Sequence, residues 1–236
     1  MSRKSVIRTF DCPQCGKEIR FKIKQEIDIP DDLVYKNKIL QNKLFSMRCK
    51  NCGFGVPVSY DTAYNDMDQK YLLRVMPTLS KKDIQTMLAY NERLKTDRAL
   101  QLARNDYRMR VVRTDMDLKE KIIIFDENLD DRIIEIMKVS CAKYIRDNMK
   151  IENDFQEFRF TKMEKSGGFR FVILFKDTKP LILNFDMEQY ESIREEMGDF
   201  IEEHTVNGFN IIDARWATQT VSEYLDKYKK ETEESR

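Results

Sequence analysis

The sequence predicts an α+β fold in which an N-terminal part and a C-terminal part are organised differently. Near the N-terminus, short segments of alternating apolar and polar residues surround two Cys-x-x-Cys pairs. The middle of the chain carries apolar residues at helical spacing, and residues 155–185 contain three strand-like segments separated by turn-forming residues. We therefore expect a ribbon-like start followed by helices, and then a small antiparallel-sheet α+β module.

The composition is that of a globular protein with a well-solvated surface. The chain has 236 residues, of which 41% are apolar and 35% are charged, and its mean hydropathy is -0.62. No stretch reaches the roughly 18 consecutive apolar residues typical of a membrane-spanning helix. The opening "MSRKSVIRTF" also lacks the apolar core of a signal peptide. The expected location is the cytoplasm, with no membrane association.

Charge is distributed unevenly along the chain. Residues 1–150 carry 30 Lys and Arg against 22 Asp and Glu, whereas residues 151–236 carry 12 against 19. The whole chain nevertheless has a net charge of only +1. Such a change of sign indicates a domain boundary. We expect one domain over residues 1–150 and an α+β module over residues 151–236.

The five cysteines include two closely similar pairs, in "DCPQCG" (residues 11–16) and "MRCKNCGF" (residues 47–54). A glycine follows the second cysteine of each pair, and 33 residues separate the pairs. In a reducing compartment this pattern favours metal binding over structural disulfides. Because four thiolates complete the tetrahedral shell of a structural zinc site, the predicted zinc ligands are Cys12, Cys15, Cys49 and Cys52. A rubredoxin-like iron site and a redox-active dithiol are the alternatives, since thiolates alone do not select the metal.

The residues between the two pairs predict a zinc ribbon with a helical insertion. Residues 18–27 alternate like a strand, and residues 30–44 have the pattern of a short helix. Residues 45–48 and 55–60 flank the second pair as strands. A thioredoxin-like redox motif needs a βαβ unit around one of the pairs, and none is predicted there, so the metal site is favoured.

These blocks together resemble the CpXC domain family, a bacterial and archaeal group named after its Cys-Pro-x-Cys motif. The resemblance rests on "CPQC", "CKNCG", "VPVSYDTAYNDMDQKYLLRVMP" and "YRMRVVRTDMDLKEKIIIFDENLDDRIIEIMK", and it covers about residues 7–150. It implies that the metal ligands are Cys12, Cys15, Cys49 and Cys52. Lys50 stands where a proline would repeat the first motif, but the ligands themselves are unaffected. The family implies no activity, so the resemblance leaves the function open.

Three helical stretches are predicted after the ribbon, with the strand "YRMRVV" after the first of them. Ser80 and Asp83 form a capping-box pattern before the first stretch, and Thr114 starts the second. The third is expected to start near Asn128, whose side chain would cap it while the acidic residues that follow favour its positive end. The same region allows a hard-cation or acid-base cluster formed by Asp126, Glu127, Asp130 and Asp131.

The C-terminal part predicts strands at residues 155–163, 168–175 and 179–185, joined by turns of hairpin length. A helix capped by Asp186 and a fourth short strand, "GFNIID", follow. The last helix carries an apolar stripe that is predicted to pack against this module: Trp216, Val221, Tyr224, Leu225 and Tyr228.

An enzyme is the less expected class. His204 is the only histidine, it is predicted to lie in a solvent-facing loop, and it has no apparent Ser or Cys partner. Cys141 falls on the apolar face of the third helix and is predicted to be a buried, unreactive thiol. No phosphate-binding loop, dinucleotide-binding motif or zinc-protease motif occurs in the sequence.

The expected function is that of a zinc-binding, non-enzymatic protein-interaction or regulatory module with protein partners. The alternative is a nucleic-acid-binding zinc ribbon, because residues 92–113 contain many basic residues: Arg93, Lys95, Arg98, Arg104, Arg108, Arg110 and Arg113. Glu92, Asp97 and Asp106 interrupt this stretch, which equally favours a solvated helix face with ion pairs. An enzyme that uses the acidic cluster is the second alternative. The sequence predicts no oligomeric state.

Overall fold

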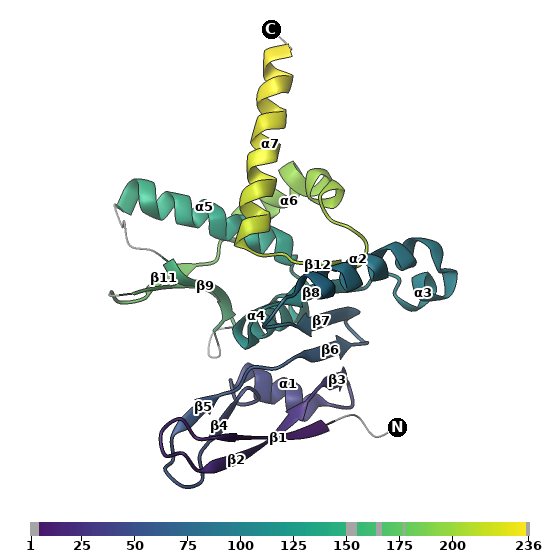
Figure 1. The fold of residues 1–236 in the computed structure, drawn as a ribbon. Coiled ribbons are helices and arrows are strands. Elements are labelled where there is room, and N and C mark those ends of the chain that lie inside the picture. Colours follow the sequence, from purple (N-terminus) through teal and green to yellow (C-terminus); the bar gives the residue numbers. More distant parts are fainter. Residues whose placement is uncertain (1–4, 150–154, 164–166, 177, 235–236) are drawn as a thin grey trace. The chain divides into compact units, whose positions relative to one another are not determined.

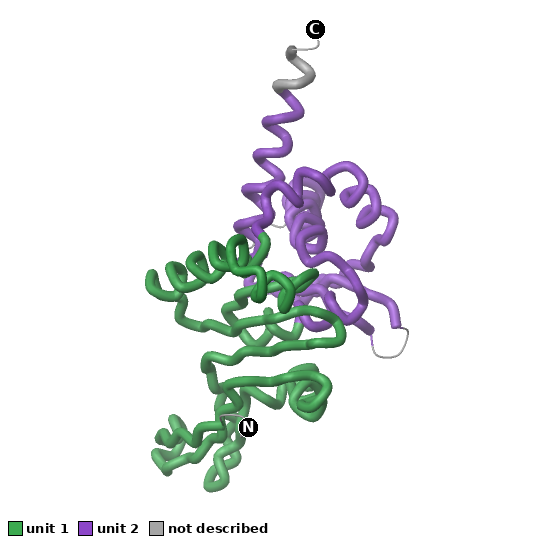
Figure 2. Tube along the Cα trace, turned by 90° about the vertical axis from the view of Figure 1, so that its right-hand side faces the viewer, with its two compact units in different colours: residues 1–119, 207–210 green, residues 120–206, 211–236 purple. Residues whose placement is uncertain are grey.

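The computed structural model describes residues 5–149, 155–163, 167–176 and 178–234 (Figure 1). Its mixture of helices and small sheets confirms the predicted α+β class. Contacts divide the chain into two compact units, unit 1 with residues 1–119 and 207–210 and unit 2 with residues 120–206 and 211–236 (Figure 2). The contacts thus divide the chain between residues 119 and 120 rather than at residue 150. A domain boundary at residue 150 remains a prediction based on the charge distribution.

Unit 1 begins with two antiparallel hairpins, each of which carries one Cys-x-x-Cys pair in its turn. The first pairs β1 (Ser5–Asp11) with β2 (Glu18–Lys24), and the second pairs β4 (Ser46–Arg48) with β5 (Gly55–Pro57). Helix α1 (Leu33–Leu40) lies between them in the chain. The predicted helix between the two Cys-x-x-Cys pairs and the strands flanking the second pair are present, whereas the single strand predicted over residues 18–27 ends at Lys24, and β3 (Glu26–Ile29) belongs to another sheet.

A five-stranded mixed sheet completes unit 1, in the order β12-β8-β7-β6-β3 (Figure 1). Its strands are β3 (Glu26–Ile29), β6 (Thr62–Asp66), β7 (Tyr71–Val75), β8 (Arg108–Val112) and β12 (Phe209–Asn210). Strands β6 and β7 form an antiparallel hairpin, whereas β3 with β6, β7 with β8, and β8 with β12 are parallel. Parallel neighbours need a crossover connection. Helices α2 (Lys81–Thr96) and α3 (Arg98–Ala103) provide it between β7 and β8.

Ser80 caps α2 as the sequence predicts. The Asp83 N–H donates to the Ser80 hydroxyl at 3.2 Å, and the Ser80 N–H donates to the Asp83 carboxylate at 2.9 Å. The Ser80 hydroxyl and N–H both hold the pKa of Asp83 below its usual value. The carboxylate therefore stays charged beside the positive end of the helix.

Strand β12 departs from the predicted organisation. The prediction that "GFNIID" belongs to the C-terminal module is wrong, because Phe209 and Asn210 pair with β8 and belong to unit 1. A two-residue strand carries too little pattern to indicate its partner. Its place is decided by residues far away in the sequence.

The side chain of Asn91 on α2 holds β12 in place. Its Nδ2 donates to the Phe209 carbonyl at 2.9 Å, and its Oδ1 accepts from the Phe209 N–H at 2.8 Å. Asn91 is only 4% exposed, so both hydrogen bonds are shielded from water. Gly208 precedes the strand with φ +127°, a conformation that residues with a Cβ rarely adopt.

Unit 2 contains the predicted three-stranded antiparallel sheet, in the order β11-β10-β9. Its strands are β9 (Phe155–Lys162), β10 (Phe169–Phe175) and β11 (Leu181–Asn184). Residues 164–166 and 177 of the predicted turns lie outside the described residues. Ring centroids 5.2 to 5.9 Å apart join an aromatic core around this sheet: Phe160, Phe169, Phe171 and Phe185.

The helices from residue 115 onwards are α4 (Asp115–Asp126), α5 (Asp131–Met149), α6 (Met187–Glu203) and α7 (Ala214–Glu234). As predicted, Thr114 and Asp186 accept hydrogen bonds from the first turns of α4 and α6. The prediction that Asn128 caps α5 is wrong, because Asp130 accepts from the Arg132 N–H at 2.9 Å. Asn128 instead has φ +55°. An asparagine tolerates this left-handed conformation, so it ends α4 rather than starting α5.

The apolar stripe of α7 packs over the first half of the helix. Trp216 and Tyr224 are half-buried, and the Tyr224 hydroxyl donates to the Glu196 carbonyl of α6 at 3.4 Å. Leu225 and Tyr228 are 49% and 58% exposed, so the prediction that the whole stripe packs is wrong for them. Within unit 2, the C-terminal part of α7 extends beyond α5 and α6 (Figure 1). None of the described helices is long and apolar enough to cross a membrane.

Replacing Gly208 with alanine is expected to loosen β12. A Cβ there would lie 2.2 Å from Asn91 Oδ1, at a backbone angle that strains an L residue. The free energy of unfolding should fall by about 1–3 kcal/mol in urea titrations, and amides 208–210 should exchange faster with deuterium. Gly198→Ala inside α6 is the matched control, since a Cβ at this position would have no atom within 4 Å outside its own helix. Unchanged stability and exchange in Gly208→Ala would contradict the role given to Asn91.

Candidate metal centre

The predicted ligands lie in two turns of the same construction, one between β1 and β2 and one between β4 and β5: Cys12, Cys15, Cys49 and Cys52. In the first turn the Gly16 N–H donates to the Cys12 carbonyl at 2.8 Å. In the second the Gly53 N–H donates to the Cys49 carbonyl at 2.9 Å. The two glycines have φ of +68° and +75°, which a residue with a side chain rarely adopts. The repeated glycine in the sequence therefore reflects a repeated turn.

The four sulfur atoms converge on one point. All of them lie within 4.8 Å of one another. Cys12 Sγ is 3.7 Å from Cys52 Sγ, and Cys15 Sγ is 3.8 Å from Cys49 Sγ. Zinc–sulfur bonds of about 2.3 Å at tetrahedral angles place the sulfurs about 3.8 Å apart. The spacing therefore fits a single metal ion, and it is too long for the disulfide bond length of about 2.05 Å.

The sulfur cluster forms part of the small apolar core of the ribbon. Cys12 and Cys49 are 2% and 3% exposed and pack with Ile19 and Val56. Cys15 is half-buried, whereas Cys52 is exposed. So small a core favours a metal as an additional source of folding free energy.

Hydrogen bonds from N–H groups to some of the four sulfur atoms favour their thiolate form. The Lys17 N–H and the Asn51 side-chain amide, whose Nδ2 lies 3.4 Å from Cys15 Sγ, lower the pKa of Cys15 to about 6. At Cys52 a hydrogen bond from the Phe54 N–H lowers the pKa, but desolvation and the neighbouring sulfurs outweigh it and raise the pKa to about 12. Backbone N–H groups of Cys52 and Asn51 also lower the pKa of Cys49. Thiolates are thus favoured at Cys15 and Cys49 but not at Cys52, and a full set of four needs a bound cation to offset their repulsion.

The donor set determines what the site can do chemically. Four thiolates suit zinc or iron, and around a tetrahedral ion they leave no position for water or substrate. The Asn51 amide was not predicted from the sequence. Its place inside the second Cys-x-x-Cys pair is the one signal that points to it, because such turn residues reach the sulfur atoms.

Residues 10–138 match the sequence family described as CpXC protein. This is more than half of the chain, and it includes both Cys-x-x-Cys pairs. The chain belongs to the CpXC family. The resemblance seen in its motifs is thereby confirmed. Neither the curated proteins nor the solved structures gave a match to this chain.

In this CpXC protein the predicted acidic cluster does not form a cation site. Among the residues that the structure describes, the four cysteines are the one group placed to hold a metal ion. Carboxylates of the acidic cluster pair with cations instead: Asp130 with Arg132, Asp131 with Lys121, and Glu127 with Lys162. Their charges are therefore already neutralised by the protein itself.

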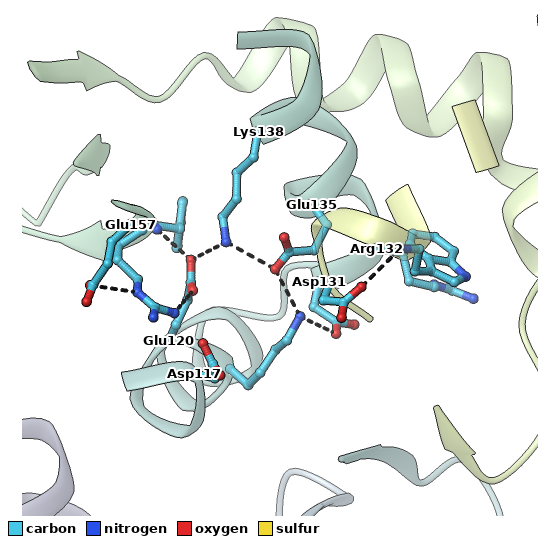
Figure 3. Close-up of polar contacts among 12 residues, drawn as sticks. Asp117, Glu120, Asp131, Arg132, Glu135, Lys138 and Glu157 are labelled. Carbon is cyan, nitrogen blue, oxygen red and sulfur yellow. Dashed lines mark hydrogen bonds and ion pairs between the residues drawn. The ribbon is translucent and has the colours of Figure 1, made fainter. Parts of the chain in front are cut away.

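Asp131 belongs to a buried network of charged side chains in unit 2, which the sequence did not predict (Figure 3). Its members come from α4, α5 and β9: Glu120, Lys121, Asp131, Glu135, Lys138 and Arg159. All but Arg159 have side chains no more than 7% exposed. Charged residues inside otherwise apolar helical runs, "KEKIIIF" and "RIIEIMK", were the available signal.

Each lysine in the network lies between two carboxylates. Lys138 Nζ is 2.6 Å from Glu120 Oε1 and 3.0 Å from Glu135 Oε1. Lys121 Nζ is 2.9 Å from Asp131 Oδ2 and 3.3 Å from the same Glu135 oxygen. Burial lowers the pKa of both lysines, but the charges of the carboxylates outweigh it and raise the pKa above the usual value. Both lysines therefore stay charged.

His204 is not the solvent-facing loop residue that the sequence predicts. Its side chain is 30% exposed, and its ring stacks on Phe200 with 3.9 Å between centroids. Nδ1 lies 2.7 Å from the Phe200 carbonyl, and Nε2 lies 3.1 Å from the Glu223 carboxylate. His204 is the residue at which α6 ends.

Cys141 is half-buried rather than buried as predicted. Burial raises the pKa of its thiol, so the thiol stays protonated at neutral pH.

The basic stretch of α2, α3 and β8 presents mixed charge. Lys95 pairs with Glu92 at 2.8 Å, and Arg93 pairs with Asp97 at 3.5 Å. Arg110 is only 5% exposed, and its guanidinium donates to the Met109 carbonyl. Part of the positive charge in this stretch is therefore paired with acidic side chains or buried.

Removing one cation from the network of Figure 3 is expected to destabilise unit 2. Lys138→Met leaves Glu120 and Glu135 short of a buried positive charge, and breaking a buried pair in this way costs about 3–5 kcal/mol. The control combines Lys138→Met with Glu135→Met, which leaves every remaining member with a partner. Urea unfolding should show the single variant to be less stable than the double variant. The opposite order would contradict the electrostatic explanation.

Proposed function

We propose that the four cysteines hold one structural zinc ion and that the protein is a zinc-stabilised binding or regulatory module. The spacing of the four sulfur atoms carries the first part, because 3.7 and 3.8 Å match the edges of a zinc–thiolate tetrahedron. Zinc is preferred over iron because closed four-cysteine shells on paired hairpins are typical of structural zinc. The intact site needs reduced thiols, so we place the protein in the cytoplasm.

A non-catalytic role with protein partners agrees with the chemistry of the site. A closed thiolate shell supplies neither a metal-bound water nor a free coordination position for a substrate. The ribbon also exposes two large apolar side chains, Ile7 on β1 at 66% and Phe54 after the second Cys-x-x-Cys pair at 41%. Exposed apolar side chains of this size favour a protein surface as the partner.

Nucleic-acid binding is the second candidate, and the charge of unit 1 favours it. Residues 1–119 carry 24 Lys and Arg against 15 Asp and Glu. Such an excess attracts polyanions, although acidic neighbours pair with part of the basic stretch. An enzyme that uses the acidic cluster is the least supported alternative, since the cluster residues Asp130 and Asp131 are each paired with a cation.

Cys12→Ser and Cys49→Ser are each expected to lower the zinc content below the value of about one ion per chain expected for a structural site. Both changes remove a ligand from the core of the ribbon, so unit 1 should loosen while unit 2 is less affected. Metal analysis gives the stoichiometry, and Trp216, the only tryptophan, reports on unit 2 by fluorescence. Cys141→Ser is the control outside the site. Full zinc occupancy in either ligand variant would contradict the assignment.

Capture of partners from a lysate of the host, with and without nuclease, tests the binding role. Protein partners that survive nuclease and are lost in an Ile7→Ser, Phe54→Ser variant are the expected result, because that variant removes the exposed apolar surface of the ribbon. Lys43→Ser, an exposed position of the same ribbon, is the control. Partners that disappear with nuclease would favour the nucleic-acid alternative.

A further inference from the structure

The four thiols of the metal centre differ in their access to solvent. Cys12 and Cys49 are almost completely buried, Cys15 is half-buried and Cys52 is exposed. Oxidation of cysteine follows thiolate character and exposure. Because a bound metal holds all four sulfurs as thiolates, exposure is the difference that remains. A small oxidant in solution therefore meets Cys52 first.

A resolving thiol lies directly beside Cys52. Cys12 Sγ is 3.7 Å away, on the other hairpin and inside the apolar core. Closing this distance to the disulfide length of about 2.05 Å requires one sulfur to move. Cys52 is the member better placed to move, since it lies in an exposed turn outside the buried cluster that contains Cys12. The pair therefore has an exposed, adaptable member and a fixed, buried member.

We propose that Cys52 is a site of oxidation by hydroperoxides and that its oxidation replaces the bound metal with a Cys12–Cys52 disulfide. This inference rests on the proposed zinc site. It gives that site a regulation that a purely structural role would not require. Phe54 follows the second Cys-x-x-Cys pair and is exposed, so the change reaches the surface proposed for partner binding.

The chemistry is balanced with the hydroperoxide as the oxidant. The Cys52 thiolate attacks the peroxide, the O–O bond breaks, and the products are a sulfenic acid and an alcohol, or water from hydrogen peroxide. The Cys12 thiolate then attacks the Cys52 sulfur, the S–S bond forms, and hydroxide leaves and takes up a proton to give water. The two sulfurs together lose two electrons. Cys15 and Cys49 remain, and two ligands do not hold zinc as four do, so the metal leaves.

Oxidation of the full-length, zinc-loaded protein by hydrogen peroxide tests the proposal. Zinc release is followed with a chromogenic chelator, and the disulfides are mapped by mass spectrometry after the free thiols are blocked. The expected result is a disulfide-linked Cys12–Cys52 peptide that appears together with free zinc. A dithiol reductant with added zinc should then reduce the disulfide and restore the bound metal. A first disulfide within one Cys-x-x-Cys pair, a disulfide with Cys141, or zinc release without any disulfide would overturn the proposal.

Two matched variants test the role of exposure. Zinc accepts three cysteines and one histidine, so Cys52→His and Cys15→His are compared after loading with zinc. Peroxide should release zinc several-fold more slowly from Cys52→His than from Cys15→His, and equal rates would overturn the inference. The zinc content of the untreated wild type separates the two proposals. Without zinc the proposed function fails and the inference fails with it, whereas bound zinc with a different first disulfide overturns the inference alone.

Discussion

The convergence of four sulfur atoms from two distant turns is the constraint on which unit 1 depends. Two-stranded hairpins are marginal in water by themselves, and the fully buried core between these two consists of few side chains: Cys12, Ile19, Cys49 and Val56. The four sulfur atoms of the two hairpins lie within 4.8 Å of one another across 33 residues of intervening chain. Strand β3 follows the first hairpin and β6 follows the second, and the two pair in parallel. The contact between the two hairpins therefore also affects the pairing of β3 with β6 at the edge of the five-stranded sheet.

Unit 2 is held by an interaction of a different kind. Lys121 and Lys138 each lie between two buried carboxylates, and Glu120 also accepts the Phe160 N–H of strand β9 at 2.6 Å. Apolar residues of similar volume often stabilise a fold as well as a buried ion pair does. Ion pairs depend on geometry more than apolar contacts do. Each lysine reaches both of its carboxylates in only one arrangement of α4 and α5, and Glu120 accepts the Phe160 N–H in only one position of β9. We infer that the network fixes the alignment of these elements.

The local elements of the fold were largely predictable. Alternation with period two correctly indicated β2 and the three strands of the C-terminal sheet, and capping patterns located the starts of α2, α4 and α6. Asn128 misled the prediction because an asparagine serves both as a helix cap and as a left-handed residue that ends a helix. Leu225 and Tyr228 misled it because periodicity gives the face of a helix but not the length over which a neighbour covers that face.

The sequence by itself determined the four cysteines of the candidate site, the family, and the order of most helices and strands. These depend on residues close together in the chain: the turn of a Cys-x-x-Cys-Gly knuckle, the alternation of a strand and the cap of a helix. The tertiary structure alone decided that β12 joins β8, that Asn91 holds it there, that charged residues of α4, α5 and β9 are buried together, and that Cys52 is exposed while Cys12 is not. Each of these is a contact, or a loss of contact with water, between segments far apart in sequence, and no local pattern records it.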